Sequence, residues 1–390
     1  MHSAILPRMK LHTVMENAPA LFANKMHDGR PVSVLLHGDP GGGKTQMMQN
    51  ILAPRLEQAT GKRVTTLIER PAERDGSEYG GIPVPVPQGE GKTRRYITAR
   101  TTPDIIVAIQ AAVEENPDGI VILTFDEFGQ ADTLSQKVIA TIANEGELTG
   151  YKIPSNVWVW GTTNFSDNGA GVGKMLTHLN NRLAHFAVYP DVGYWIKHFA
   201  LSNALLPGAI AWADQNRGSL EKPTVAKDGP YLTVRSFTYG VNALKSIKQA
   251  RGDTDPRTIP DDEFAVATLA GFIGQEHAQQ FMAIAPVMEK LPKPADIYRD
   301  PAGTPVPQAS DFYLQFPLQS VLINLLLGNP TPEQQMALLE YTSRLSPDLA
   351  SGVFAVAHNP REGRSVLGSP AAQQFVAQHV SLFTAISQAV

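Results

Sequence analysis

The sequence predicts an α/β fold in which a parallel five-stranded sheet carries a phosphate-binding loop and an α-helical half follows. Three observations predict this fold. A glycine-rich loop at 38–45 lies between a β-branched run and a helix-forming segment. Four further apolar, β-branched runs follow before residue 190, and helical periodicity replaces them from Asp191 onward. We therefore expect one domain at 1–190 and another at 191–390.

Composition narrows the class of protein. A chain of 390 residues with 43% hydrophobic residues is long enough for two or three packed domains. The net charge of −4 predicts no bulk attraction to nucleic acid or anionic membranes, and the absence of cysteine excludes disulfides and thiolate chemistry. The N-terminal residues lack a signal-peptide core, and no apolar run approaches the ~20 residues of a membrane helix. We expect a soluble, cytoplasmic protein.

The central motif fits the phosphate-binding pattern G-x-x-x-x-G-K-[ST], between a strand at 32–36 and a helix at 46–56. Its glycines let backbone N–H groups converge on phosphate oxygens at a helix N-terminus. Lys44 is expected to reach a nucleotide's outer phosphates, and Thr45 to ligate Mg²⁺. A glycine-rich turn matching by accident is the alternative, which the flanking strand and helix disfavour. The expected nucleotide-binding residues are Gly38, Asp39, Pro40, Gly41, Gly42, Gly43, Lys44, Thr45 and Gln46.

Segments on either side of the loop complete the first part of the domain. A lead-in helix at 11–27 has apolar residues on one face, and a second strand is expected at 63–69. The segment 71–98, rich in Gly, Pro and charge, is too long for an ordinary connection and predicts a functional insertion. Its basic and aromatic residues 93–96 are too few to make a nucleic-acid site, since an exposed face is commoner. A helix follows to about residue 115.

The strand at 119–125 ends abruptly in Asp126 and Glu127. Ligands bind at the carboxyl ends of strands in open α/β sheets, so both carboxylates are expected at that edge. Beside a phosphate loop, Asp126 is the natural outer-sphere magnesium partner and Glu127 the base that orients the attacking water. An exposed Asp-Glu turn is the alternative.

The rest of the sheet is predicted from three segments. After a helix at about 132–144, residues 146–154 have the pattern of a small hairpin around a Thr-Gly turn. A fourth strand at 157–163 ends in Asn164, whose amide could position the water or the γ-phosphate, and its two tryptophans are expected in the core. Helix-like residues 173–181 then lead through Arg182 to the fifth strand at 184–188.

Helical periodicity dominates the second half of the chain, with Pro- and Gly-containing connectors between helices. Helices are expected at 191–203, 207–216, 234–250, 263–289, 311–327, 332–345 and 371–388.

These motifs together resemble the AAA+ ATPases, specifically their MoxR-type branch in bacteria and phages. The resemblance implies an α/β P-loop NTPase core with an α-helical lid and a C-terminal helical region. It implies that 71–98 contains a helix-2 insert, that 146–154 is a pre-sensor-1 hairpin and that Asn164 is the sensor-1 residue.

The resemblance also assigns two arginines. Arg182 stands where the family carries its arginine finger, and Arg235 stands where it carries sensor-2 at the start of the lid helix. Leu183 departs from the family's usual phenylalanine after the finger, and Val234 from its usual proline before sensor-2.

The function that the resemblance implies is a Mg²⁺-dependent ATPase that assembles into a homo-oligomeric ring, expected to be a hexamer, or into a spiral. Hydrolysis would drive remodelling of a protein client, often with a von Willebrand A-type partner. Two alternatives remain open from the sequence: a nucleotide-locked scaffold with slow turnover, and a DNA-engaging motor or loader.

Overall fold

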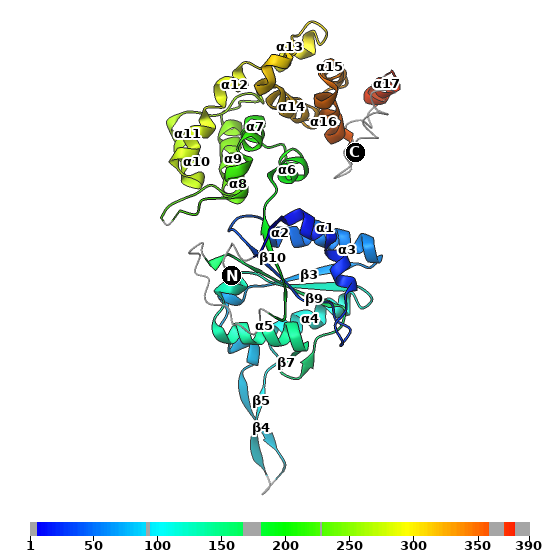
Figure 1. The fold of residues 1–390 in the computed structure, drawn as a ribbon, viewed down its shortest axis with the longest axis vertical. Coiled ribbons are helices and arrows are strands. Elements are labelled where there is room, and N and C mark those ends of the chain that lie inside the picture. Colours follow the sequence, from blue (N-terminus) through cyan, green and yellow to red (C-terminus); the bar gives the residue numbers. More distant parts are fainter. Residues whose placement is uncertain (1–5, 91–93, 167–180, 227, 359–369, 379–390) are drawn as a thin grey trace. The chain divides into compact units, whose positions relative to one another are not determined.

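The computed structural model describes residues 6–90, 94–166, 181–226, 228–358 and 370–378 (Figure 1). The chain divides into two compact units, Met1–Asp191 and Val192–Val390.

The first unit contains a six-stranded parallel sheet in the order β1-β10-β2-β9-β6-β3. Strands β2, β6 and β9 are buried at every position, which explains why they appear in the sequence as continuous apolar runs. The five expected strands all form. The strand bounds are β1 (Arg8–Lys10), β2 (Val34–Gly38), β3 (Val64–Glu69), β6 (Ile120–Phe125), β9 (Val157–Thr163) and β10 (Ala184–Tyr189).

Helices α1 to α3 lie on one side of this sheet, and α4 and α5 on the other (Figure 1). Trp158 and Trp160 of β9 are fully buried, with ring centroids 4.9 Å apart, so both belong to the core as expected. The helix after the phosphate loop contains a five-residue π-helical segment in its middle. The helix bounds are α1 (Leu11–Ala23), α2 (Lys44–Met47), the π segment Met48–Leu52, α3 (Ala53–Thr60), α4 (Asp104–Glu115) and α5 (Thr133–Glu145).

Two antiparallel hairpins extend from this unit. The insertion after β3 contains two short 3₁₀ turns and then the hairpin of β4 (Pro83–Gln88) and β5 (Arg95–Arg100), which runs two residues past the expected end. The second hairpin joins β7 (Glu147–Leu148) to β8 (Tyr151–Lys152), within the expected range. Its turn residues Thr149 and Gly150 both have positive φ, as a two-residue type I′ turn requires.

The second unit is helical. Its core contains an aromatic group in which the Trp212 and Phe237 rings stack 5.1 Å apart and Phe281 meets both edge-on. None of the helices in the described residues is long and apolar enough to cross a membrane. The helices are α6 (Val192–Trp195), α7 (Pro207–Gln215), α8 (Arg217–Glu221), α9 (Val234–Ala250), α10 (Glu263–Ile273), α11 (Gln275–Met282), α12 (Ala285–Glu289), α13 (Pro294–Arg299), α14 (Phe312–Leu327), α15 (Pro332–Ser343), α16 (Pro347–His358) and α17 (Pro370–Gln378).

The single helix expected over 263–289 is wrong, because this stretch forms α10, α11 and α12. Gly274, at φ 84°, ends α10, and Pro286 lies in the first turn of α12, which begins at Ala285. The helix expected at 371–388 is described only as far as Gln378. Three helices, α8, α13 and α16, were not expected from the sequence.

Candidate functional site

The phosphate loop connects the end of β2 to the start of α2, and glycine stands at positions where a side chain would clash or strain the backbone. A Cβ atom on Gly38 would lie 2.8 Å from the carbonyl oxygen of Val188 on the neighbouring strand β10. Gly43, with φ 83°, is the left-handed N-cap of α2. The loop therefore has the geometry expected of an anion-binding turn at a helix N-terminus.

Lys44 lies across the loop, and the loop's own acceptors hold its ammonium group. Its Nζ donates to the carbonyl oxygens of Gly38 and Asp39, both at 3.0 Å, and to Oδ1 of Asn164 at 3.1 Å. Asn164 is buried, and it follows β9, the strand that separates β2 from β6. The sheet order thus brings together two polar side chains that are 120 positions apart in the chain.

Thr45 and Asp126 form the second contact across this edge. The Thr45 hydroxyl donates to Oδ1 of Asp126 at 2.7 Å, and the hydroxyl of Thr162 donates to the same oxygen at 2.5 Å. Thr162 lies in β9, where the sequence shows only a buried strand residue. Its role was missed because the contact becomes visible only when β6 and β9 are paired.

Glu127 has a left-handed backbone, with φ 55°, which is uncommon for a residue with a Cβ atom. Its N–H donates to the Thr162 hydroxyl at 3.3 Å, and its side chain is exposed. Thr162 therefore contacts both acidic residues after β6. This turn directs the Glu127 carboxylate to solvent, as a base for a water molecule requires.

The donor set here fits Mg²⁺. A hydroxyl oxygen and a carboxylate oxygen only 2.7 Å apart are hard ligands at the carboxyl edge of the sheet. Within the described residues, no cluster of three or more His, Cys, Asp or Glu side chains could hold a metal alone. Mg²⁺ typically uses one or two protein ligands and completes its shell with water and phosphate oxygens, so this small donor set is sufficient.

Arg8 of β1 links the phosphate loop to the segment after β9. Its Nη1 lies 3.2 Å from Oδ2 of Asp39, a loop residue whose side chain is 5% exposed. Its guanidinium also lies over the Phe165 ring, 4.4 Å from the centroid. Phe165 follows Asn164, so Arg8 contacts one residue of the loop and the neighbour of a second site residue. This role could not be predicted from the sequence, because β1 has only three residues and two of them are basic.

A pair of histidines lies directly behind the loop. Nε2 of His37 and Nδ1 of His185 are 2.8 Å apart, and their rings stack across β2 and β10. Burial, followed by the proximity of His185 and Lys44, lowers the pKa of His37 to about 3. His37 is therefore neutral at physiological pH, and it adds no charge beneath the loop.

The two arginines named by sequence lie in different units. Arg182 is half-buried two positions before β10, and most of the segment 173–181 ahead of it lies outside the described residues. Arg235 is exposed in the first turn of α9, after a capping box between Thr233 and Ser236. The roles expected of these arginines stay predictions.

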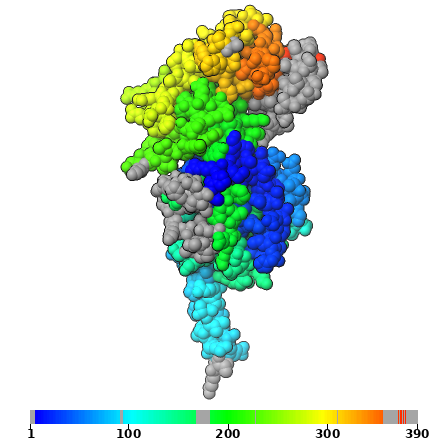
Figure 2. All heavy atoms as spheres, in the orientation of Figure 1, coloured from blue at the N-terminus to red at the C-terminus, as the bar shows by residue number. Residues whose placement is uncertain are grey.

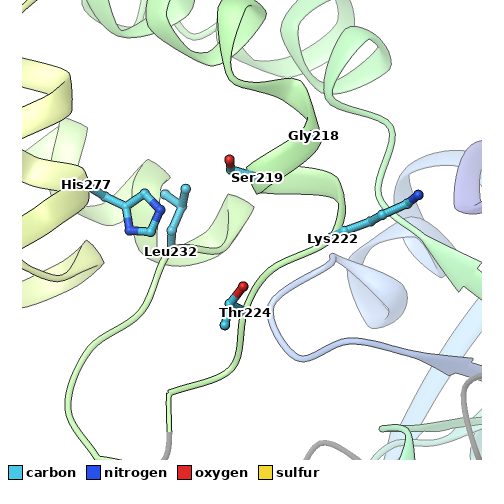
Figure 3. A pocket seen from close by; sticks show the side chains of 6 residues that line it. All are labelled: Gly218, Ser219, Lys222, Thr224, Leu232 and His277. Atoms are coloured by element: carbon cyan, nitrogen blue, oxygen red, sulfur yellow. The ribbon is translucent and has the colours of Figure 1, made fainter.

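The second unit has a surface hollow of about 200 Å³ (Figure 3). It lies between α8, the connector after it and α11, and its Lys222 and Thr224 side chains are exposed. Its lining residues are Gly218, Ser219, Lys222, Thr224, Leu232 and His277. None of these residues was expected in a site.

No protein-family model matches this chain, and no curated protein matches it significantly. Solved structures are similar to it at low identity. The Aeropyrum pernix ORC2 protein, in ADPNP and ADP complexes, is 11% identical with a TM-score of 0.38, covering 80% of each chain. A Thermotoga maritima RuvB mutant is 14% identical with a TM-score of 0.36, covering 76% of this chain and 79% of that one.

A third similar structure is the Escherichia coli HORMA:CdnC:Trip13 complex, at 14% identity and a TM-score of 0.33. The matched region covers 73% of this chain and 88% of that one. Because these scores and identities are low, the description of the site depends on this chain's own strand order and contacts.

Proposed function

We propose that this chain is an AAA+ ATPase that binds Mg²⁺·ATP on the 38–45 loop and hydrolyses it to ADP and phosphate. One observation carries the proposal: four polar side chains from three separate parts of the sequence meet at one edge of the sheet. Lys44 reaches Asn164 at 3.1 Å, and Thr45 reaches Asp126 at 2.7 Å. A lysine, a hydroxyl, a carboxylate and an amide beside a glycine-rich helix start are the groups that phosphoryl transfer needs.

The loop would bind the nucleotide through its backbone N–H groups and Lys44. The Lys44 ammonium, now held by neutral carbonyl and amide oxygens, would exchange them for outer phosphate oxygens. Thr45 and Asp126 would hold Mg²⁺, which when bound neutralises charge on the phosphates. The two hydroxyls on Asp126 fix its carboxylate toward Thr45 and so preorganise the ligand pair.

Water activation would fall to Glu127 and Asn164. The exposed carboxylate of Glu127 would accept a proton from the attacking water, and the Asn164 amide would orient that water or the γ-phosphate. Asn164 is already fixed by its contact with Lys44. The same amide can therefore respond to the displacement of Lys44 when phosphates enter.

The assembly part of the proposal depends on the resemblance to MoxR-type proteins. We infer a hexameric ring or a spiral in which Arg182 stabilises charge on the neighbour's ATP and Arg235 reports nucleotide state to the lid. The 71–98 and 146–154 insertions would then transmit hydrolysis to a protein client, with a von Willebrand A-type protein as a possible partner. No contact in the described residues specifically favours the scaffold or the DNA-motor alternative.

Phosphate release by Thr45 variants tests the proposed site. Thr45→Ser keeps a hydroxyl for Asp126 and Mg²⁺, whereas Thr45→Val keeps the shape and removes the oxygen. We expect Mg²⁺-dependent release to persist in the serine variant and to fall at least about tenfold in the valine variant, a loss of about 1.4 kcal/mol or more. Equal release by the two variants would contradict the site.

A further inference from the structure

The hairpin of β4 and β5 has two different outer edges. Pro83, Pro85 and Pro87 occupy every second position of β4 and lie opposite Arg100, Thr98 and Tyr96 of β5. Ile82 lies opposite Thr101, one position before the Pro83–Arg100 pair. The Thr101 N–H donates to the Ile82 carbonyl, so Ile82 and Thr101 form a hydrogen-bonded pair. In an antiparallel ladder such pairs alternate, so every proline falls in a non-hydrogen-bonded pair, where backbone groups point outward.

This pattern blocks one edge and leaves the other open. The outer edge of β4 lacks N–H donors at its three prolines, which is how natural proteins prevent strand pairing. The outer edge of β5 instead presents the N–H and C=O groups of Tyr96, Thr98 and Arg100. Among the described residues β5 pairs only with β4, so these outward groups have no strand beside them.

The hairpin is also unusually exposed. Figure 2 shows it as a narrow projection from its unit. Tyr96 is 65% exposed and Ile97 41%, although aromatic and β-branched residues are typical of covered strands. A two-stranded hairpin is marginally stable in water, and a third strand would add hydrogen bonds and cover such side chains.

Charge indicates the kind of strand that fits. Residues 82–101 contain four basic residues and one acidic residue, in a chain whose net charge is −4. Arg94 lies over the Tyr96 ring at 5.7 Å, and Arg95 donates to the Gln88 side chain. Within the part of the chain that the structure describes, neither arginine forms an ion pair with a carboxylate. An acidic segment would be attracted to this surface, whereas a basic one would be repelled.

We propose that β5 accepts an extended, acidic segment of a partner protein as an added strand. The main-chain groups of Tyr96, Thr98 and Arg100 would supply the hydrogen bonds, and the arginines would select the charge. The proposal goes beyond the proposed ATPase function and needs no nucleotide turnover.

Thr98 offers a sharp test, because its N–H faces outward and takes no part in the β4–β5 ladder. Thr98→Pro removes that donor, whereas Thr98→Val keeps it with a similar shape. The probe is a fluorescent peptide of alternating glutamate and valine, titrated into the full chain, with a lysine–valine peptide as the charge control. We expect wild type and Thr98→Val to bind the acidic peptide alike, and Thr98→Pro to bind it about tenfold or more weakly.

Amide hydrogen exchange checks the mechanism. The acidic peptide should protect the amides of Tyr96 and Arg100 in wild type, and the ladder amides of Ile97 and Ala99 should stay protected in free Thr98→Pro. Equal peptide binding by Thr98→Pro and Thr98→Val would overturn strand addition. Binding of the lysine peptide equal to that of the acidic peptide would overturn the charge assignment.

Two other occupants give distinct results. If the arginines bind duplex DNA, DNA binding would be lost in Arg94→Gln and Arg95→Gln but retained in Thr98→Pro. DNA binding with this pattern, together with no binding of the acidic peptide, would overturn the proposal. If β5 instead pairs with a second copy of the chain, the protein would self-associate, and this association would be lost only in Thr98→Pro. That result would overturn the choice of a separate partner protein.

Discussion

At the residue scale, His37 links the fold to pH. It lies in β2 immediately before the phosphate loop and is fully buried against His185. Burial first, and then the nearby His185 and Lys44, lower its pKa from 6.5 to about 3. The folded protein therefore excludes a proton that the unfolded chain binds below pH 6.5.

Because the unfolded chain binds this proton more tightly, the folded protein loses stability as the pH falls. The contribution of neutral His37 is fully present above pH 6.5 and is lost as the pH falls toward 3, by up to roughly 1.4 kcal/mol per pH unit. We expect unfolding midpoints measured between pH 7.5 and 4.5 to fall more steeply for wild type than for His37→Gln, which cannot titrate. Parallel profiles for the two proteins would contradict the assigned pKa shift.

At this scale, the spacing of residues predicts chemistry only where the reacting groups lie close together in the chain. The G-x-x-x-x-G-K-[ST] spacing predicts the roles of Lys44 and Thr45, since both lie on one continuous stretch. Thr162 and Arg8 could not be found in this way. Their contacts with Asp126 and Asp39 arise from strands that are adjacent in the sheet and distant in the chain.

At the element scale, Asp132 joins the start of α5 to the insertion after β3. Its Oδ1 accepts the Ser135 N–H at 2.8 Å as an N-cap, and its Oδ2 accepts the Gly76 N–H at 3.2 Å. The hydrogen bond from Ser135 is the first cause of its lowered pKa. One carboxylate thus caps a helix and holds the base of the insertion.

We expect Asp132→Ala to lower the free energy of unfolding by about 1 kcal/mol, because the cap is lost, and to speed hydrogen exchange at Gly76. Asp132→Ser is the matched control, since a serine hydroxyl can cap α5 but has only one oxygen. It should recover most of the stability and little of the Gly76 protection. Slow exchange at Gly76 in the alanine variant would show that the insertion is held by other contacts.

The elements themselves were largely predictable, and the exceptions have physical causes. Buried parallel strands such as β6 are continuous apolar runs, which the sequence shows plainly. Strand β1 was missed because its three residues include two basic side chains and form an edge of the sheet. The 263–289 helix was predicted as one because apolar periodicity continues across Gly274, whose positive φ nevertheless ends α10.

At the scale of the whole molecule, we propose that each ATP is shared between two copies of the chain. Arg182 is half-buried just before β10 and would act on the neighbour's nucleotide. We expect Arg182→Ala to bind ATP but to hydrolyse it more slowly than wild type. Measured arginine fingers raise the rate of hydrolysis by roughly 10³-fold or more, so a loss of that size is expected. Mixing it with Lys44→Ala should recover activity, because mixed assemblies contain interfaces with an intact loop and an intact finger.

Sedimentation is the control for this mixing experiment. Wild type should assemble with a slowly hydrolysed ATP analogue, since a ligand at the interface stabilises assembly by linkage. The two variants should also enter common assemblies. Co-assembled mixtures no more active than either variant alone would contradict action in trans, and a wild type that stays monomeric with the analogue would contradict the ring.

We propose that the edge formed by β2, β9 and β6 binds and hydrolyses ATP. The most direct test is an ATP-binding titration with parallel phosphate release for wild type, Lys44→Ala and Glu127→Gln. We expect Lys44→Ala to lose ATP binding, since Lys44 supplies the only ammonium group in the loop, and Glu127→Gln to bind ATP without hydrolysing it. Equal ATP binding by the two variants, or wild-type phosphate release by either, would contradict the proposal.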